Sequence, residues 1–368
     1  MRNFVKYALL FLNFLSALLL LLGRFIPSIN PFEQSFIGIL AYIIPVLAVI
    51  NIAFLIFWLI ARKYYFGIVS LIAIAFTWNI WSVYVGGNIL SKQDFTKDST
   101  RFSLMTYNVR LLDLYNWSGK KNTRSEIIDF FKTQNSDVLC LQEFYTGNDS
   151  MGFDNINAIK YACDYPYVSM CDVNVNKRGR WGSVLFSKMP IIQSINHDID
   201  VKGSNQLQQV DLLVNNDDTV SIFNIHLKSN RFSSKESELV GKTEIPTLDD
   251  TTISRTKKIY DKVLNNTISR GLEAELVSNV IQHNLHKTIV CGDLNDIASS
   301  YVYFKMRTNL NDAFLEKGKG LGATYAGAIP LLRIDYLFFS KALKLHGFST
   351  MHVNYSDHYP LKASFSLN

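Results

Sequence analysis

Long stretches without a charged residue dominate the start of the chain. These uncharged runs are 17, 28 and 28 residues long and occupy positions 7–23, 34–61 and 64–91. A run of about twenty apolar residues is enough for a helix to cross a bilayer. The pattern therefore predicts a membrane anchor over residues 1–86, with three transmembrane helices at about 5–23, 37–60 and 66–86.

The first run has a second interpretation, a cleaved signal peptide. No small-x-small cleavage site follows it, and two more apolar runs do, which favours a retained anchor. Basic residues indicate the orientation, because cytoplasmic loops of membrane proteins are enriched in Lys and Arg. Arg2 and Lys6 precede the first run, and Arg62 and Lys63 separate the other two. The chain from residue 87 onward is therefore expected on the extracytoplasmic side of an inner or plasma membrane.

The pattern changes after residue 86. Residues 87–101 are polar and aperiodic, which predicts a linker, and 102–109 read as a strand with Asn108 near its end. Thr123 and Glu126 have the spacing of a capping box and indicate a helix start. The apolar run 137–143 then predicts a buried strand that ends at Glu143. Strand, helix and strand with polar residues at the strand ends is how α/β proteins assemble sites.

The same arrangement recurs further along the chain. A helix is expected over about 255–285 and a last alternating strand near 361–367. Polar residues stand on or after apolar strands at His226, at Gly292-Asp293-Leu-Asn295, at Asp335 and at Asp357-His358. Each alone has an ordinary explanation, such as a turn-forming Asp or a core His. Their joint occurrence at successive strand termini favours a functional site.

Composition separates the two parts of the chain. The mean hydropathy of +0.09 and the 18% of charged residues fit neither a membrane bundle nor a disordered chain. Residues 1–100 hold seven of the 37 basic and three of the 31 acidic residues, a net charge of +4. The remaining 268 residues carry only +2 and have the size of one large globular domain.

Charge also bears on the partner. Binding of long nucleic acids usually needs a basic face, and +2 provides no general excess. The polar insert 228–258, with Phe232 and Leu239, is a candidate lid that selects the substrate. A local basic patch near the His226 strand and a solvated lid are both open interpretations of Lys228, Arg231, Lys235, Lys257 and Lys258. A tethered domain would meet membrane lipid at high effective concentration.

Six separated motifs together resemble those of one family. Tyr-Asn108-Val, Leu-Gln-Glu143, Asn-Ile-His226-Leu, Gly-Asp293-Leu-Asn295, Arg-Ile-Asp335-Tyr and Ser-Asp357-His358 are similar, in order, to the motifs of the endonuclease/exonuclease/phosphatase superfamily. The resemblance covers about 101–368. It implies the deoxyribonuclease I-like fold, a four-layer α/β sandwich of two stacked mixed sheets flanked by helices, over residues 102–368.

The resemblance also implies a metal site. Phosphoesters are negatively charged, so their hydrolysis depends on positioning and on neutralising charge at phosphorus. Hard oxygen ligands suit Mg²⁺ or Mn²⁺. Glu143 is expected to be the principal metal ligand, with Asn108 and Asp357 nearby.

Catalytic roles follow from the same resemblance. Asp293 is expected to orient or deprotonate the attacking water, and Asn295 to hold the phosphate or that water. His358, paired with Asp335, would stabilise developing charge. His226 is a candidate acid or phosphate donor.

Two arginines qualify the comparison. Arg180 is a candidate phosphate ligand, for which a solvated loop arginine is an equal alternative. Arg110 stands two positions after Asn108, where some DNA-repair members carry an acidic residue. The abasic-site endonuclease analogy is weakened, whereas lipid phosphodiesterases and general nucleases stay open.

The leading hypothesis is a membrane-anchored, metal-dependent phosphodiesterase or phosphoesterase of the nuclease type. Its substrate would be nucleic acid, phospholipid or inositol phosphate, and no obligate protein partner is evident. A phospholipid or sphingolipid phosphodiesterase is the alternative within the enzyme class. A non-catalytic membrane-tethered scaffold is the alternative of another class.

The four cysteines have structural interpretations. Cys140 and Cys291 lie within predicted strands, where buried thiols are the default. Cys163 and Cys171 lie in an irregular stretch and are candidates for a disulfide if the domain is extracytoplasmic.

Overall fold

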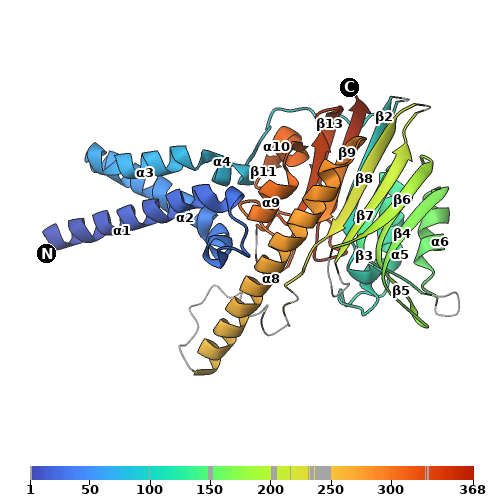
Figure 1. Ribbon diagram of the computed structural model, residues 1–368, viewed down its shortest axis with the longest axis horizontal. Helices are drawn as coiled ribbons and strands as arrows, with labels where there is room; N and C mark the ends of the chain where they lie inside the picture. The colour runs from blue at the N-terminus through green and yellow to red at the C-terminus, as the bar shows by residue number, and fades with distance from the viewer. Residues whose placement is uncertain are drawn as a thin grey trace.

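Two six-stranded β-sheets stack face to face, with helices on their outer faces (Figure 1). This computed structural model describes residues 2–98, 100–147, 152–199, 205–215, 217–230, 232, 236, 250–327, 329 and 331–368. The α/β sandwich expected from the motifs is confirmed.

The first sheet has the strand order β13-β14-β2-β3-β5-β4. Among its described strands, β2 and β3 are the one parallel pair, and the other pairs are antiparallel. The bounds are β2 (Arg101–Asn108), β3 (Val138–Gly147), β4 (Tyr167–Asn176), β5 (Gly179–Ser187), β13 (Leu343–Thr350) and β14 (Leu361–Leu367).

The second sheet has the order β10-β12-β9-β8-β7-β6, again with one parallel pair, β8 and β9, in its described part. Its strands are β6 (Ile191–Asp198), β7 (Gln206–Leu213), β8 (Thr219–His226), β9 (Lys287–Asp293), β10 (Leu310–Asp312) and β12 (Asp335–Ser340). A separate two-stranded ribbon pairs β1 (Gly86–Gly87) with β11 (Lys319–Gly320).

Apolar strand sequences are explained by burial on both faces. Between the sheets, side chains such as Leu104, Ile222 and Ile289 form one fully buried cluster. The outer face of the first sheet is covered by α5 (Thr123–Gln134) and α6 (Asn155–Ala162). The outer face of the second is covered by α8 (Asp250–Gln282) and α9 (Tyr301–Met306), and α10 (Ala313–Lys317) packs on β13. Strands covered on both faces read as continuous hydrophobic runs.

Helix α5 begins where the sequence predicted, but not with a capping box. Asn122, rather than Thr123, occupies the N-cap position, and no side-chain hydrogen bond caps the helix. The Thr123 hydroxyl instead lies 2.7 Å from the Ser118 hydroxyl. A local alternative partner therefore replaces the expected cap.

The N-terminal apolar region forms α1 (Arg2–Leu22), a 3₁₀ segment η1 (Gly23–Ser28) and α2 (Ser35–Ile60). The third predicted helix, over 66–86, is broken in the structure. Helix α3 (Tyr64–Phe76) is followed by α4 (Trp78–Trp81) and η2 (Ser82–Tyr84), with a bend of 60°. Within the part of the chain that the structure describes, two helices are long and apolar enough to cross a membrane, or three if the bent pair counts as one.

Buried polar side chains join the three long apolar helices. The Asn13 amide donates to the Ser70 hydroxyl over 2.6 Å, and Ser70 donates to the Asn51 carbonyl oxygen over 3.0 Å. The Trp58 indole donates to the other side of Asn13 over 2.8 Å. Such hydrogen bonds stabilise helix association where water is absent.

The predicted linker between the apolar helices and the sandwich contacts the sandwich. The Gln93 amide donates to the Lys317 carbonyl over 2.7 Å and accepts from the Phe348 backbone over 2.7 Å. Arg101 pairs with Asp94 over 2.6 Å. The predicted linker is therefore attached along the side of the α/β sandwich.

All four cysteines are free and buried, so the structure has no Cys163–Cys171 disulfide. Burial raises the pKa of Cys163 to about 11 and that of Cys171 to about 12. Cys140 of β3 instead contacts Cys291 of β9 between the two sheets.

We expect all four thiols to react with iodoacetamide in denaturant without reductant, and to react slowly in the native protein at pH 8, because burial disfavours the thiolate. Mass mapping of tryptic peptides measures both. A tryptic pair linked through Cys163 and Cys171 in the unreduced sample would contradict the structure.

Candidate active site at the ends of the central strands

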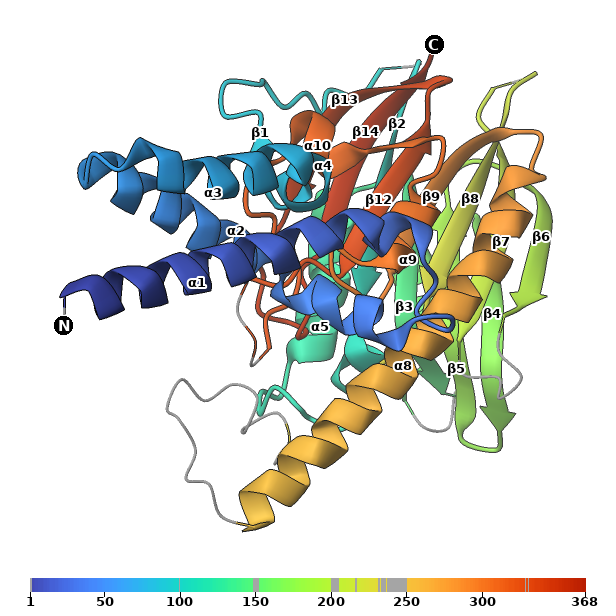
Figure 2. The ribbon, with the colours of Figure 1, turned by 60° about the vertical axis from the view of Figure 1, so that its left-hand side comes forward.

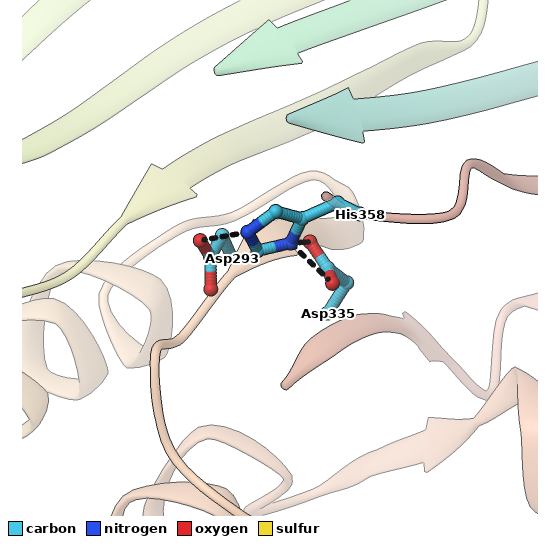
Figure 3. Close-up of side chains that lie close together, drawn as sticks. All are labelled: Asp293, Asp335 and His358. Carbon is cyan, nitrogen blue, oxygen red and sulfur yellow. Dashed lines mark hydrogen bonds and ion pairs between the residues drawn. The ribbon is translucent and has the colours of Figure 1, made fainter. Parts of the chain in front are cut away.

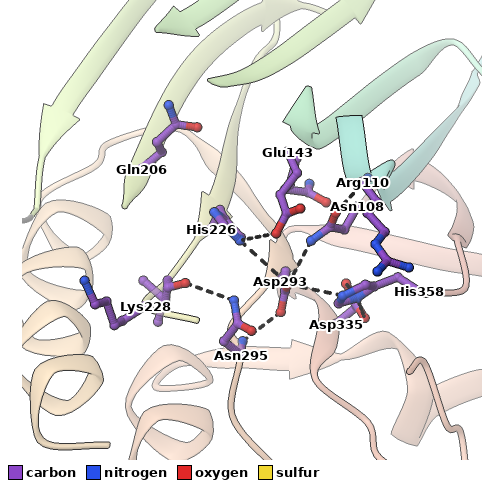
Figure 4. A network of polar contacts seen from close by, with 12 residues as sticks. Asn108, Arg110, Glu143, Gln206, His226, Lys228, Asp293, Asn295, Asp335 and His358 are labelled. Atoms are coloured by element: carbon purple, nitrogen blue, oxygen red, sulfur yellow. Dashed lines mark hydrogen bonds and ion pairs between the residues drawn. The ribbon is translucent and has the colours of Figure 1, made fainter. Parts of the chain in front are cut away.

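The two parallel strand pairs bring polar residues to one edge of the sandwich. Asn108 is the last residue of β2 and lies beside Gln142 of β3, while His226 and Asp293 end β8 and β9 in register. The Asn108 amide donates to Asp293 Oδ2 over 3.0 Å and so connects the two sheets (Figure 4). Carboxyl ends of parallel strands are where α/β proteins place their sites.

A sharp turn presents Asp293. Gly292 has φ +129°, and a Cβ there would lie 2.1 Å from the Ile225 carbonyl oxygen, so only glycine fits. Asn295 has φ +51°, which Asn tolerates better than most residues. Its backbone N–H donates to Asp293 Oδ1 over 2.8 Å, and its side-chain amide donates to the Leu227 carbonyl over 2.9 Å.

Glu143 owes its position to a β-bulge. The register between β3 and β5 shifts between Leu141 and Phe144, and Glu143 has φ +45°. A bulge re-aims one side chain, and a left-handed backbone at a non-glycine residue costs roughly 1–3 kcal/mol. The Glu143 side chain keeps 35% of its surface exposed, and its Oε1 lies 3.5 Å from His226 Nε2. The strained backbone therefore belongs to Glu143, whose carboxylate is partly exposed.

His358 bridges two buried carboxylates (Figure 3). Its Nδ1 lies 2.9 Å and 3.2 Å from the two oxygens of Asp335, and its Nε2 lies 3.7 Å from Asp293 Oδ2. Burial lowers the pKa of His358, but Asp335 and Asp293 outweigh it and raise the pKa to about 10. The imidazole is therefore a cation at neutral pH, with Nε2–H directed at the site.

The two carboxylates that face the site have separated pKa values. Burial raises the pKa of Asp293 to about 6, against the lowering effect of His358. Burial also raises the pKa of Glu143, but His226, His358 and Asn108 lower it to about 2. Such a pair provides one group that is always ionised and one that exchanges protons near neutrality.

His226 has an incompletely satisfied ring. Its side chain is 10% exposed, and Nε2 lies 3.5 Å from Glu143 and 3.9 Å from Asp293. These distances are too long for good hydrogen bonds, and Nε2 has no hydrogen-bond partner among the described residues. Burial lowers the pKa of His226, but Glu143 and Asp293 raise it by more, so the pKa lies above its ordinary value. The nitrogen is suited to donate to an anionic ligand.

The residues fit a divalent cation. Glu143 is ionised and partly exposed, and the side-chain oxygen of Asn108 accepts one hydrogen bond among the described residues, from the Arg110 backbone over 3.1 Å. Carboxylate and amide oxygens are the ligands that Mg²⁺ and Mn²⁺ prefer. A second possible cluster, Asp293, Asp335 and His358, has ligand atoms within 4.8 Å of one another. Because His358 there is a cation paired with Asp335, the Glu143 side of the site suits a metal better.

Two predicted residues lie outside this contact network. Asp357 pairs with Arg110 over 3.4 Å rather than with Glu143. Arg180 on β5 forms two hydrogen bonds to Asp172, of 2.9 and 2.7 Å, at the surface. The structure thus gathers seven of the nine candidates, and it gives Arg180 the carboxylate of Asp172 as its anionic partner.

The candidate lid over 228–258 falls partly outside the described residues. Arg231, Lys235 and Leu239 are among those not described, while Lys257 and Lys258 are exposed on α8.

Sequence reasoning missed residues that support the site. The Gln142 amide donates to Asn224 over 2.6 Å, and Asn224 donates to Gln208 over 3.1 Å, which forms a buried polar layer between the sheets. The signal available was a polar residue inside each apolar strand. The Tyr325 ring packs edge-on against His358 at 5.6 Å, and no sequence pattern pointed to it.

A cleft of about 400 Å³ adjoins the site. Its lining includes Arg110, Trp117, Lys120 and Asp357. The Arg110 guanidinium stacks on the Trp117 ring at 4.8 Å. All four residues of the turn η3 (Arg110–Asp113) have positive φ, between 43° and 60°. This strained turn places Arg110 at the cleft wall, where it pairs with Asp357.

Comparisons with known proteins agree with the fold. The model of the Endonuclease/Exonuclease/phosphatase family matches residues 105–358, and a model of a domain of unknown function matches residues 6–84. No curated protein matches the chain.

Three solved structures illustrate the likeness. An endonuclease/exonuclease/phosphatase from Bacteroides vulgatus is 15% identical, with TM-score 0.53 over 73% of this chain and 100% of that one. The human Nocturnin catalytic domain with bound sulfate is 17% identical, with TM-score 0.50 over 75% and 98%. The mannosyl-6-phosphatase Bt3783 of Bacteroides thetaiotaomicron is 13% identical, with TM-score 0.50 over 72% and 100%. At these identities the likeness shows the fold alone.

Replacing Asp335 by Asn should lower the pKa of His358 from about 10, because burial then acts against the cation with only Asp293 and Asp357 to favour it. The titration of the His358 ring carbons by NMR measures the shift. Asp129→Asn, exposed on α5, is the matched control and should leave the titration unchanged. An unchanged His358 titration in Asp335→Asn would contradict the assigned pairing.

Proposed function

We propose that this chain, which belongs to the endonuclease/exonuclease/phosphatase family, is a metal-dependent hydrolase that cleaves a phosphoester by in-line attack of water. The observation that carries the proposal is the environment of Asp293. This buried carboxylate, with a pKa of about 6, lies among the Asn108 amide and the imidazoles of His226 and His358. It is a proton acceptor surrounded by groups that stabilise anions.

Each residue then has a role set by its geometry. Asp293 accepts the proton of the attacking water, and the Asn295 side-chain oxygen orients that water. His358 and His226 donate from Nε2 to phosphoryl oxygens, which gain charge as the bond to the leaving group breaks. Asp335 keeps the His358 cation in place through Nδ1.

The active protonation state spans a defined pH range. Asp293 must be ionised, which requires a pH above about 6, and His358 must be protonated, which requires a pH below about 10. Both conditions hold at neutral pH.

Glu143 and Asn108 are the residues that would hold Mg²⁺ or Mn²⁺ in this enzyme. The cation would neutralise charge on the phosphate. A strained Glu143 backbone supports this role, because such strain is retained where the side-chain position matters.

The adjoining cleft supports a substrate that extends beyond the scissile phosphate. Lys120 and Arg110 provide positive charge, and the half-exposed Trp117 ring provides a flat apolar surface. A phosphodiester with a ring-bearing group, such as a nucleotide unit, matches this lining better than an acyl chain does.

A lipid phosphodiesterase is the second candidate, favoured by one observation, the apolar helices that would hold the site close to a bilayer. Turnover on DNA, RNA, phospholipid vesicles and inositol phosphates separates the two. A scaffold without catalysis predicts no turnover on any of them.

We further propose that the catalytic domain lies on the membrane face opposite the N-terminus. The α1 N-terminus and the turn between α2 and α3 lie at the end of the helices away from the sandwich (Figure 1). Arg2, Lys6, Arg62 and Lys63 are in these two places, so the positive-inside rule assigns the sandwich to the extracytoplasmic side.

Asp293→Asn should lower kcat by about 10²–10⁴-fold, because the amide cannot accept a proton from water. Steady-state assays on the full-length protein in detergent measure this, with thermal unfolding to show that the fold persists. Asp217→Asn in an exposed turn is the control. Full activity of Asp293→Asn would disprove the proposed mechanism.

Removing divalent cations with EDTA should abolish hydrolysis, and Mg²⁺ or Mn²⁺ should restore it. Glu143→Gln should raise the cation concentration for half-maximal activity about tenfold or more, since a charged ligand is lost. Glu126→Gln on α5 should not. Undiminished activity after chelation would exclude metal dependence.

A further inference from the structure

A buried ion pair lies directly behind the loop over residues 293–299, which carries Asp293. Arg270 of α8 and Asp296 are 0% and 1% exposed, and Arg270 Nε donates to Asp296 Oδ2 over 3.1 Å. Burying two charges is costly unless every remaining donor and acceptor is satisfied. The way in which this pair is satisfied is therefore informative.

One partner that both charged side chains share comes from the apolar N-terminal region. Tyr42 of α2 accepts from Arg270 Nη2 over 2.8 Å and donates to Asp296 Oδ1 over 3.1 Å. One phenol thus bridges the cation and the anion. Thr267 of α8 also accepts from Nη2, over 3.1 Å.

The ion pair contacts the two segments that follow strands β8 and β9. Asp296 follows Asn295, whose backbone N–H holds Asp293 Oδ1. Arg270 Nη1 donates to the carbonyl oxygen of Lys228, two residues after His226, over 2.9 Å. Displacement of Arg270 or Asp296 would therefore be transmitted to both segments.

Other contacts from the apolar region reach the same loops. Ser299 donates to the Ala41 carbonyl over 2.8 Å and lies 2.7 Å from the Tyr84 hydroxyl. Ile297 belongs to the hydrophobic cluster of the N-terminal helices. Arg333, two residues before Asp335, donates to the Val83 carbonyl over 3.3 Å. The start of α2 packs against α8, and η1 packs against α9 (Figure 2).

Close packing at this interface excludes a loose tether. A Cβ on Gly38 of α2 would lie 2.8 Å from the Thr267 methyl group, and one on Gly271 of α8 would lie 2.5 Å from Asn30 Oδ1. A passive anchor needs neither such contacts nor a phenol inside a buried ion pair.

We propose that Tyr42 is a positioning residue of the catalytic site, and that the apolar helices form a structural part of it. By completing the Arg270–Asp296 pair, Tyr42 holds the 293–299 loop in the geometry that Asp293 needs. The inference rests on the proposed function for its catalytic consequence, but loop order can be measured without activity.

The test compares Tyr42→Phe with wild type in the full-length protein in detergent. Tyr42→Phe keeps the ring and removes the hydroxyl, so Arg270 and Asp296 each lose a hydrogen bond. Hydrogen–deuterium exchange should rise about tenfold in peptides over 293–299 and stay unchanged in peptides over β2. On a substrate that the wild type cleaves, kcat should fall about 10- to 100-fold with KM within about twofold.

Two further variants sharpen the test. Tyr65→Phe, on α3 with an 84% exposed side chain, is the matched control and should change neither measurement. Tyr42→Phe combined with Asp296→Asn should lose little more kcat than Asp296→Asn alone, because both variants disrupt the same cluster of Tyr42, Arg270 and Asp296.

The outcomes are distinguishable. If wild type cleaves no phosphoester, the proposed function fails, and the exchange data alone decide the positioning role. Unchanged exchange at 293–299, an equal rise in β2, or local exchange without a fall in kcat in an active enzyme would each overturn the inference.

Discussion

Burial of the Asp293 carboxylate where the two sheets meet is the constraint on which the site depends. A buried charge must be hydrogen-bonded or paired, and an unpaired one costs several kcal/mol. Asp293 meets this demand with the Asn108 amide, the Asn295 backbone and two imidazoles. In the proposed reaction, the same groups that make its burial possible would stabilise negative charge on a phosphoester, so stability and catalysis would use one set of contacts.

The buried Arg270–Asp296 pair behind the site is subject to the same constraint. Breaking a buried ion pair such as Arg270–Asp296 by removing one partner costs about 3–5 kcal/mol. Its hydrogen bonds reach the segment after β8, the segment after β9 and helix α2. The helices and the sandwich are therefore joined through buried polar contacts. Such contacts stabilise the protein only if their geometry is kept.

Local sequence patterns predicted the strands well where burial is two-sided. The runs before Asn108, Glu143, His226 and Asp293 all proved to be central strands. Prediction was poorer where tertiary contacts override local preference. The third apolar helix breaks at Thr77, whose hydroxyl bonds back to the Ala73 carbonyl over 2.7 Å. The contacts of the predicted linker, such as that of Gln93 with Lys317, join residues remote in sequence and have no local signal.

The amino-acid sequence by itself determined the family, the α/β class and the apolar start, and it supplied the candidate site residues, since these depend on periodicity and on residue types at strand ends. Only the tertiary structure decided which of those residues meet. It joined Asp293 to Asn108 and His358, and it left Asp357 with Arg110 and Arg180 with Asp172. It also put Tyr42 behind the catalytic loop, across 254 residues from Asp296. Contacts across such separations follow from the packing of sheets and helices, which no local pattern encodes.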